Sequence, residues 1–160
     1  MEATIEHLSA YELERNKPMP TLNHAIIQAN LIFALKLRYR QQYSIASEIN
    51  LTMPERPDTV PDVAIYPKLQ LNFLHDTVSM TQMPLTAIEI VSPSQSDTEI
   101  LLKFERYFKA GVQSCWLVMP SFQAISVYAA INKYNFFSEN DTLTDPVTGI
   151  ELTVSDAFTE

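Results

Sequence analysis

Two short apolar runs in the middle of the chain each contain one carboxylate, and this feature constrains the fold more than any other. Residues 60–66 surround Asp62 with valine, alanine and isoleucine, and residues 85–92 surround Glu89 in the same way. Runs of this length and composition predict buried β-strands. Because charged side chains are rarely buried unless they are paired or bound to a cation, Asp62 and Glu89 are the first candidates for a shared site.

The length and composition predict one globular domain over residues 1–160. A chain of 160 residues is long enough for one sizeable core, and its 46% of hydrophobic residues excludes a disordered composition. No apolar run approaches the ~18 residues of a membrane span, and no basic-then-apolar leader opens the chain. We therefore expect a soluble cytoplasmic protein with no membrane partner.

The charge balance excludes one class of nucleic-acid binder. Lysine and arginine number 11 against 19 acidic residues, which gives a formal net charge of -8. A protein that coats DNA indiscriminately presents a basic surface, and this composition does not supply one. A nuclease remains compatible with it, because acidic side chains can gather at a metal site while a local basic face meets the phosphates.

The single cysteine, Cys115, excludes an intrachain disulfide and favours a reducing compartment. It lies within the apolar sequence SCWLVM. A small buried hydrophobic residue is the favoured interpretation of Cys115, and a reactive thiol is the alternative.

Two helices are predicted from apolar spacing and capping residues. Residues 21–40 carry apolar side chains three and four positions apart. The predicted stripe consists of Leu22, Ile26, Ala29, Phe33 and Leu37, widened by Ala25, Ile32 and Leu35. The second helix is predicted over residues 98–110. Ser96 or Asp97 would cap its start, and Gly111 would end it.

Strands are predicted between and after these helices, at residues 43–53, 60–66, 85–92, 115–119, 125–130 and 150–154. Residues 67–84 are polar and irregular and predict a loop. The order is helix, strand, strand, strand, helix, strand, followed by C-terminal strands. A strand–helix–strand crossover gives a parallel, right-handed connection, so we expect an α/β (α+β) fold with a mixed central sheet flanked by helices.

The ordered set of segments resembles a known family. It consists of VPDVAIYPK, PLTAIEIVSPSQ and GVQSCWLVMP, with Lys103 and Tyr107 between the last two. This set resembles the Uma family of restriction-endonuclease-like proteins, a branch of the PD-(D/E)xK nuclease superfamily. The resemblance extends to ELERNKPMPTLNHA near the start and DPVTGIEL near the end, so it covers nearly the whole chain. It implies a restriction-endonuclease-like core.

The resemblance also implies a metal site. Asp62 and Glu89 would hold a divalent cation, most often Mg2+ and alternatively Mn2+, and the backbone carbonyl of Ile90 would complete the coordination. Magnesium prefers hard oxygen ligands and retains several waters, so two carboxylates and a substrate phosphate suffice. The cation would activate a water for phosphodiester hydrolysis and stabilise charge on the leaving oxygen.

The resemblance places a catalytic lysine on the second helix. The superfamily pattern has its lysine two residues after the second acidic residue, but that position here is Val91. The family resembles one in which this lysine has moved to the following helix, where Lys103 matches. Glu14, His24 and Gln28 match further positions that the family has near its site.

Each of these residues also has a structural interpretation. Asp62 follows a proline and is typical of a turn at a strand start. Lys103 belongs to a charged series with Glu99 and Arg106 that is typical of a solvated helix face. His24 on its own is typical of a surface or capping residue.

The leading functional hypothesis is a magnesium-dependent endonuclease that hydrolyses DNA, and a homodimer would suit cutting of both strands. A catalytically inactive module that binds nucleic acid or a protein on the same fold is the alternative. Hydrolysis of another phosphate-bearing substrate would use the same groups. Fold alone does not decide among these functions.

Overall fold

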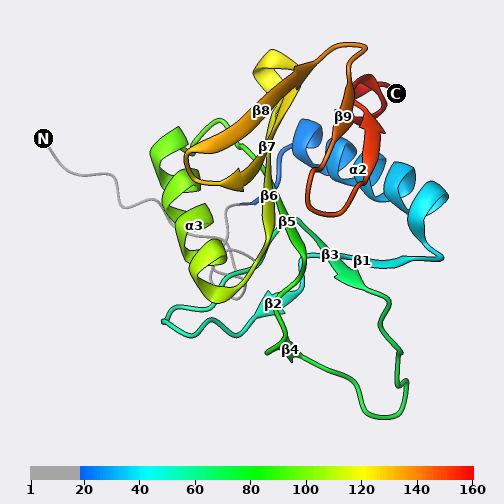
Figure 1. Cartoon of the computed structure of the whole chain (residues 1–160), viewed down its shortest axis with the longest axis vertical. Helices are drawn as coiled ribbons and strands as arrows, with labels where there is room; N and C mark the ends of the chain where they lie inside the picture. The colour runs from blue at the N-terminus through cyan, green and yellow to red at the C-terminus, as the bar shows by residue number, and fades with distance from the viewer. Residues whose placement is uncertain (1–18) are drawn as a thin grey trace, which may run out of the picture.

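The computed structural model describes residues 19–160, and its central feature is a six-stranded mixed sheet with one long helix on each face (Figure 1). The strand order is β1-β3-β5-β6-β7-β8. These strands are β1 Tyr43–Ser47, β3 Val63–Pro67, β5 Thr86–Ile90, β6 Ser114–Met119, β7 Ala124–Ala130 and β8 Lys133–Ser138. The predicted mixed sheet with flanking helices is confirmed.

The crossover predicted from the sequence is also present. Strand β5 pairs with β6 in parallel, and helix α3, Asp97–Ala110, connects them. The other neighbouring pairs of the large sheet are antiparallel. Two small sheets are added to it, a parallel pair of β2 Asn50–Leu51 with β4 Ser79–Met80, and an antiparallel pair of β9 Thr142–Thr144 with β10 Glu151–Thr153.

Helix α2, Leu22–Tyr39, has the predicted extent but buries a different face. Thr21 caps it, and its Oγ1 accepts a hydrogen bond from the His24 N–H. The residues that pack against the sheet are Ile27, Leu31 and Leu35, whereas Leu22, Phe33 and Leu37 are 74%, 68% and 70% exposed. The centre of the predicted stripe is therefore wrong, and only Leu35 at its margin is fully buried. Both rows are apolar at helical spacing, and the sheet selects the face that meets its isoleucines.

Helix α3 confirms its predicted start and end. The Ser96 hydroxyl accepts a hydrogen bond from the Glu99 N–H, and the Glu99 carboxylate accepts one from the Ser96 N–H, which forms a capping box. Gly111 ends the helix with φ 110, in the left-handed region that glycine adopts without strain. These caps fix where the helix starts, and so which of its side chains reach the sheet.

The pleat of the sheet divides the core into two layers. The layer under α2 contains Val63, Ile65, Ile88, Ile90, Trp116 and Val118. The layer under α3 contains Ala64, Tyr66, Ala87, Cys115 and Leu117, together with Ile100, Phe104 and Tyr107 of the helix itself. Because side chains alternate between faces, Glu89 lies on the α3 face. Cys115 is fully buried, which confirms the favoured interpretation of a small buried residue, and burial raises the pKa of its thiol well above the usual range.

The C-terminal region contains elements that the sequence did not indicate. Strands β8 and β9 were not predicted, and the short helices are η1 Pro120–Phe122 and α4 Ser155–Phe158. Buried Asp145 accepts hydrogen bonds from the Trp116 indole N–H at 2.8 Å and from the Ser114 hydroxyl at 2.7 Å, which fastens this region to the sheet. Between residues 19 and 160, no helix is both long and apolar enough to cross a bilayer.

Candidate active site

Strand register brings the two candidate carboxylates together. Strands β3 and β5 are antiparallel with Val63 opposite Ile88, so Asp62, the residue just before β3, lies beside the end of β5 that carries Glu89. The hydrogen bond from the Ile90 N–H to the Asp62 carboxylate confirms this proximity. Asp62 and Glu89 are each only 2% exposed. Two carboxylates from separate strands therefore share one buried location.

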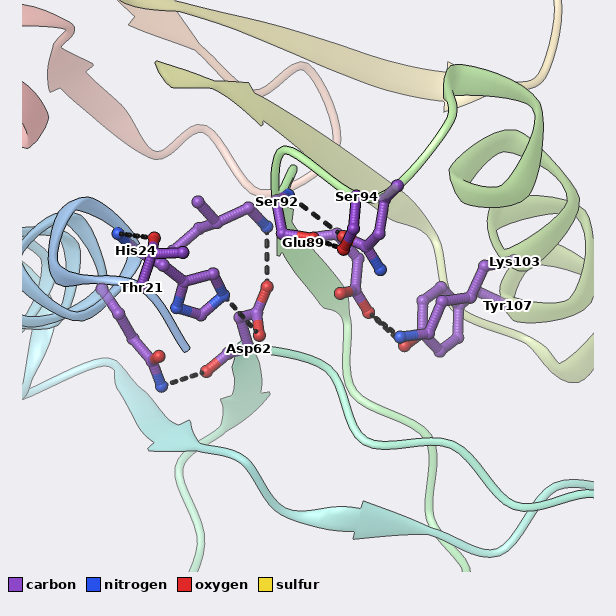
Figure 2. A network of polar contacts seen from close by, with 11 residues as sticks. Thr21, His24, Asp62, Glu89, Ser92, Ser94, Lys103 and Tyr107 are labelled. Carbon is purple, nitrogen blue, oxygen red and sulfur yellow. Dashed lines mark hydrogen bonds and ion pairs between the residues drawn. The ribbon is translucent and has the colours of Figure 1, made fainter. Parts of the chain in front are cut away.

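Asp62 is held from the α2 side. The Ile90 N–H donates to Asp62 Oδ2 at 2.7 Å, and His24 Nε2 lies 3.1 Å from Oδ1. The Gln28 amide donates to the Asp62 carbonyl at 3.0 Å. His24 and Gln28, one turn apart on α2, thus both contact Asp62. Figure 2 shows the imidazole of His24 turned toward the Asp62 carboxylate.

The second nitrogen of His24 has a different environment. His24 is 9% exposed, and within the described part of the chain its Nδ1 has no hydrogen-bond partner. An imidazole that donates through Nε2–H to a carboxylate leaves a lone pair on Nδ1 in its neutral form. The contact with Asp62 therefore fixes the orientation of the imidazole ring, with Nε2 toward the carboxylate.

Glu89 is held from the α3 side. The Tyr107 hydroxyl donates to Glu89 Oε1 at 2.6 Å, and Lys103 Nζ lies 2.7 Å from the same oxygen. The ammonium also lies 5.9 Å from the centroid of the Tyr107 ring. Figure 2 shows both side chains meeting Glu89 from one helix. The side chain of Lys103 is only 21% exposed, so the solvated-face interpretation of Lys103 is wrong.

The neighbouring cations of α3 have other partners. The Arg106 guanidinium donates to the backbone carbonyls of Glu55 and Pro57, and Lys109 pairs with the Glu55 carboxylate at 2.8 Å. Both contacts are made to the loop after β2, not to Glu89. Lys103 is the helix cation that contacts a buried carboxylate among the described residues.

Tyr107 is a functional candidate that the sequence analysis named only as part of the family resemblance, without a role at the site. Burial, and then the charge of Glu89, raise the pKa of Tyr107 well above its ordinary value. The phenol therefore stays protonated and remains a hydrogen-bond donor to Glu89. Its oxygen also lies 3.3 Å from Thr59 Oγ1. An aromatic residue four positions after Lys103 was the available signal, because i and i+4 share a helix face.

A cavity of about 20 Å³ lies among these groups, lined by Asp62, Glu89, Ile90 and also Glu48. Glu48 follows β1, with φ 50, and its N–H donates to the Asp62 carbonyl at 3.3 Å. No sequence pattern pointed to Glu48, because tertiary structure sets the left-handed conformation of this residue after a strand. A volume of this size holds about one water-sized particle.

The residues present fit a divalent cation with few protein ligands. In residues 19–160, no three histidine, cysteine, aspartate or glutamate side chains come close enough to form a complete metal cage. Magnesium does not require one, because it is usually held by one or two carboxylates and keeps several waters. Asp62 and Glu89 supply hard oxygens, and Ile90 lines the same cavity. Glu14, the remaining predicted position, lies outside the described residues.

Comparisons with known proteins agree with this architecture. A crystal structure described as a putative nuclease belonging to DUF820 from Anabaena variabilis ATCC 29413 superposes with a TM-score of 0.75. It is 25% identical in sequence, and the match covers 89% of this chain and 83% of that chain. A comparison with curated proteins gives no match. The model of the family Uma2, described as "Putative restriction endonuclease", matches residues 6–155, and the chain therefore belongs to the Uma2 family.

Proposed function

We propose that this protein is a metal-dependent endonuclease that hydrolyses DNA phosphodiester bonds with Mg2+ or Mn2+. Family membership makes nucleic acid the substrate class. The observation that carries the proposal is that buried Asp62 and buried Glu89 line one small cavity, with Lys103 2.7 Å from Glu89. Charged groups are seldom buried together unless a cation balances them.

Asp62, Glu89 and the carbonyl of Ile90 would hold the cation. When bound, it lowers the pKa of a coordinated water and stabilises charge on the leaving oxygen. The two carboxylates also keep the site negative until the cation arrives, which favours its capture from solution.

Lys103 is assigned to the substrate rather than to the cation. Its ammonium would orient the attacking water and stabilise the negative charge that develops on the phosphate. Burial of most of the side chain strengthens this interaction, because water screens it less. The contact with Glu89 holds the ammonium in position before substrate binds.

The remaining residues position the carboxylates. His24 and the Ile90 N–H fix the two oxygens of Asp62, and Tyr107 fixes one oxygen of Glu89. Groups that orient metal ligands in this way tune both affinity and geometry. His24 and Tyr107 are therefore positioning residues in this proposal.

The test is incubation of supercoiled plasmid, linear duplex DNA and RNA with the protein in magnesium, manganese or EDTA. We expect nicking and linearisation of plasmid with either metal, none with EDTA, and none with Asp62→Ala. Cleavage that survives EDTA or Asp62→Ala would rule out the assigned site. Metal-dependent thermal stabilisation without cleavage would support the inactive binding module instead.

A homodimer forms part of the same proposal, because cutting both strands of a duplex needs two sites. The outer face of α2 exposes Leu22, Phe33 and Leu37, which a second copy would cover. Light scattering should give twice the monomer mass. Phe33→Glu with Leu37→Glu should halve that mass, and an unchanged mass would remove this face from the dimer.

A further inference from the structure

A large groove lies beside the acidic cavity on the same face of the sheet. Its volume is about 520 Å³, which is within the range of roughly 300–1,000 Å³ found for small-molecule sites. His24, Ser92 and Gln95 line both the groove and the acidic cavity. The two spaces are therefore adjacent and share part of their walls.

One row of residues across the sheet connects the two spaces. Glu89 is paired with Leu117, Leu117 with Ser126, and Ser126 with Phe136. Residues in one row point to the same face, and neighbouring strands lie roughly 4.8 Å apart, so Phe136 lies about 14 Å from Glu89. Leu117, Ser126 and Phe136 all line the groove. The groove thus begins one strand away from the carboxylates.

The lining of the groove suits a flat, uncharged ligand. Phe122 and Phe136 present aromatic rings that are 72% and 55% exposed. Asn23 and Gln95 add amide groups, which offer both donors and acceptors. Among the described residues of the lining, no lysine or arginine is present, whereas Asp97 is. A phosphate would be repelled there, but the face and edge of a nucleobase would be accommodated.

We propose that this groove binds an unpaired nucleobase of the strand whose phosphate occupies the acidic site. The proposal rests on the proposed nuclease function. Aromatic side chains bind single-stranded nucleic acid by stacking on exposed base faces. In a duplex those faces are covered by neighbouring bases, so the protein should favour single-stranded or locally unpaired DNA over continuous duplex.

The test is binding of short fluorescent oligonucleotides in Ca2+, which takes oxygen ligands as Mg2+ does and so keeps a cation at the carboxylates. Fluorescence anisotropy measures the affinity, and a gel of each sample checks that the strands stay uncut. We expect tighter binding of single-stranded DNA than of the matched duplex. Phe122→Ala and Phe136→Ala should each weaken single-strand binding about five- to one-hundred-fold, the range of base–aromatic stacking. Phe73→Ala is the matched control, because Phe73 is 90% exposed in the long loop between β3 and β4, at the bottom of Figure 1.

An oligonucleotide with one abasic position separates a base contact from a general loss of affinity. The abasic position is moved along the strand, and each oligonucleotide is compared with the intact one. At one position the missing base should weaken binding to the wild type but not to Phe136→Ala. Equal effects in both proteins at every position would overturn the base-binding groove. Equal affinity for single-stranded and duplex DNA would also overturn it. The same holds if Phe122→Ala and Phe136→Ala change the oligomeric state but not the affinity for single strands.

Plasmid nicking in magnesium distinguishes this failure from failure of the proposed function. If the wild type nicks plasmid and both aromatic variants bind single strands as tightly as wild type, the base-binding proposal is contradicted. The nuclease assignment then stands. If the wild type does not nick plasmid but its binding of single strands depends on Phe122 and Phe136, the nuclease proposal is contradicted and the base-binding proposal is supported. Circular dichroism of each variant checks that these exposed positions were changed without unfolding.

Discussion

The ammonium of Lys103 lies 2.7 Å from Oε1 of Glu89, fixed there by a helix rather than by the strand that carries the carboxylate. The strand position two residues after Glu89 is Val91, which brings no charge. Helix α3 starts at a capping box, and Lys103 lies one turn after buried Ile100 and one turn before buried Tyr107. This spacing keeps the lysine on the side of the helix that faces the sheet.

Lys103→Ala should lower DNA cleavage by about a hundred- to a thousand-fold, the range seen when one charge-stabilising group is removed. Cation affinity should not weaken, because the lysine binds substrate and its loss makes the site more negative. Nicking assays and calorimetry measure the two effects. Lys109→Ala is the matched control, because Lys109 is on the same helix, its side chain is 73% exposed, and it pairs with Glu55 of the loop after β2. Equal nicking by both variants would contradict the role of Lys103.

Asp62→Asn and Glu89→Gln should each weaken Mg2+ or Mn2+ binding by at least about tenfold, equivalent to roughly 1.4 kcal/mol. The unfolding free energy without metal should stay level or rise, because each change removes one of two close negative charges. Calorimetry and urea unfolding measure these quantities. Glu105→Gln controls for net charge, since Glu105 is exposed on α3. Unchanged affinity in both site variants would exclude these ligands.

Tyr107→Phe should lower the unfolding free energy at neutral pH by about 1–3 kcal/mol, because Glu89 loses a buried hydrogen bond. The pKa of Tyr107 is raised in the folded protein above the value of 10.0 for an unperturbed tyrosine. The contribution of Tyr107 to the unfolding free energy is therefore complete below pH 10.0 and is lost as the pH rises further. Wild-type stability should thus fall more steeply than that of the variant between about pH 9 and pH 11. Parallel curves would show that Tyr107 does not carry this dependence.

Tyr66 provides the comparison for that measurement. Burial raises the pKa of Tyr66 to about 12, which gives the same direction of pH dependence. Its hydroxyl donates to the Gln82 carbonyl at 2.9 Å and does not contact Glu89. Tyr66→Phe should therefore reduce the alkaline loss of stability without altering metal affinity, whereas Tyr107→Phe should alter both.

Local signals predicted the parts of the fold that local physics controls. Ser96 and Gly111 set the ends of α3, because a hydroxyl cap and a left-handed glycine act within one turn. Apolar composition around Glu89 predicted a strand with all five residues buried. The buried face of α2 was not predictable, because two apolar rows compete and only the packed sheet decides between them.

The candidate site was predictable only where the family resemblance supplied tertiary information. Asp62 and Glu89 are 27 positions apart, and their meeting depends on the β3–β5 register, which no short sequence window contains. Glu48 and Phe136 came from the structure alone. Glu48 lies at the cavity because its own backbone is left-handed where it follows β1. Phe136 lies at the groove because it belongs to strand β8, which was not predicted.

His24→Ala should lower cation affinity and cleavage by about ten- to a hundred-fold, because removal of a group that orients a metal ligand has effects of this size. The physical reason is the 3.1 Å contact between His24 Nε2 and Asp62 Oδ1. His24→Gln should recover most of the loss, since its amide can donate to the same oxygen. Calorimetry with Mn2+ and plasmid nicking measure the two quantities together. A purely structural histidine would instead lower thermal stability in both variants and leave their metal affinities equal to wild type.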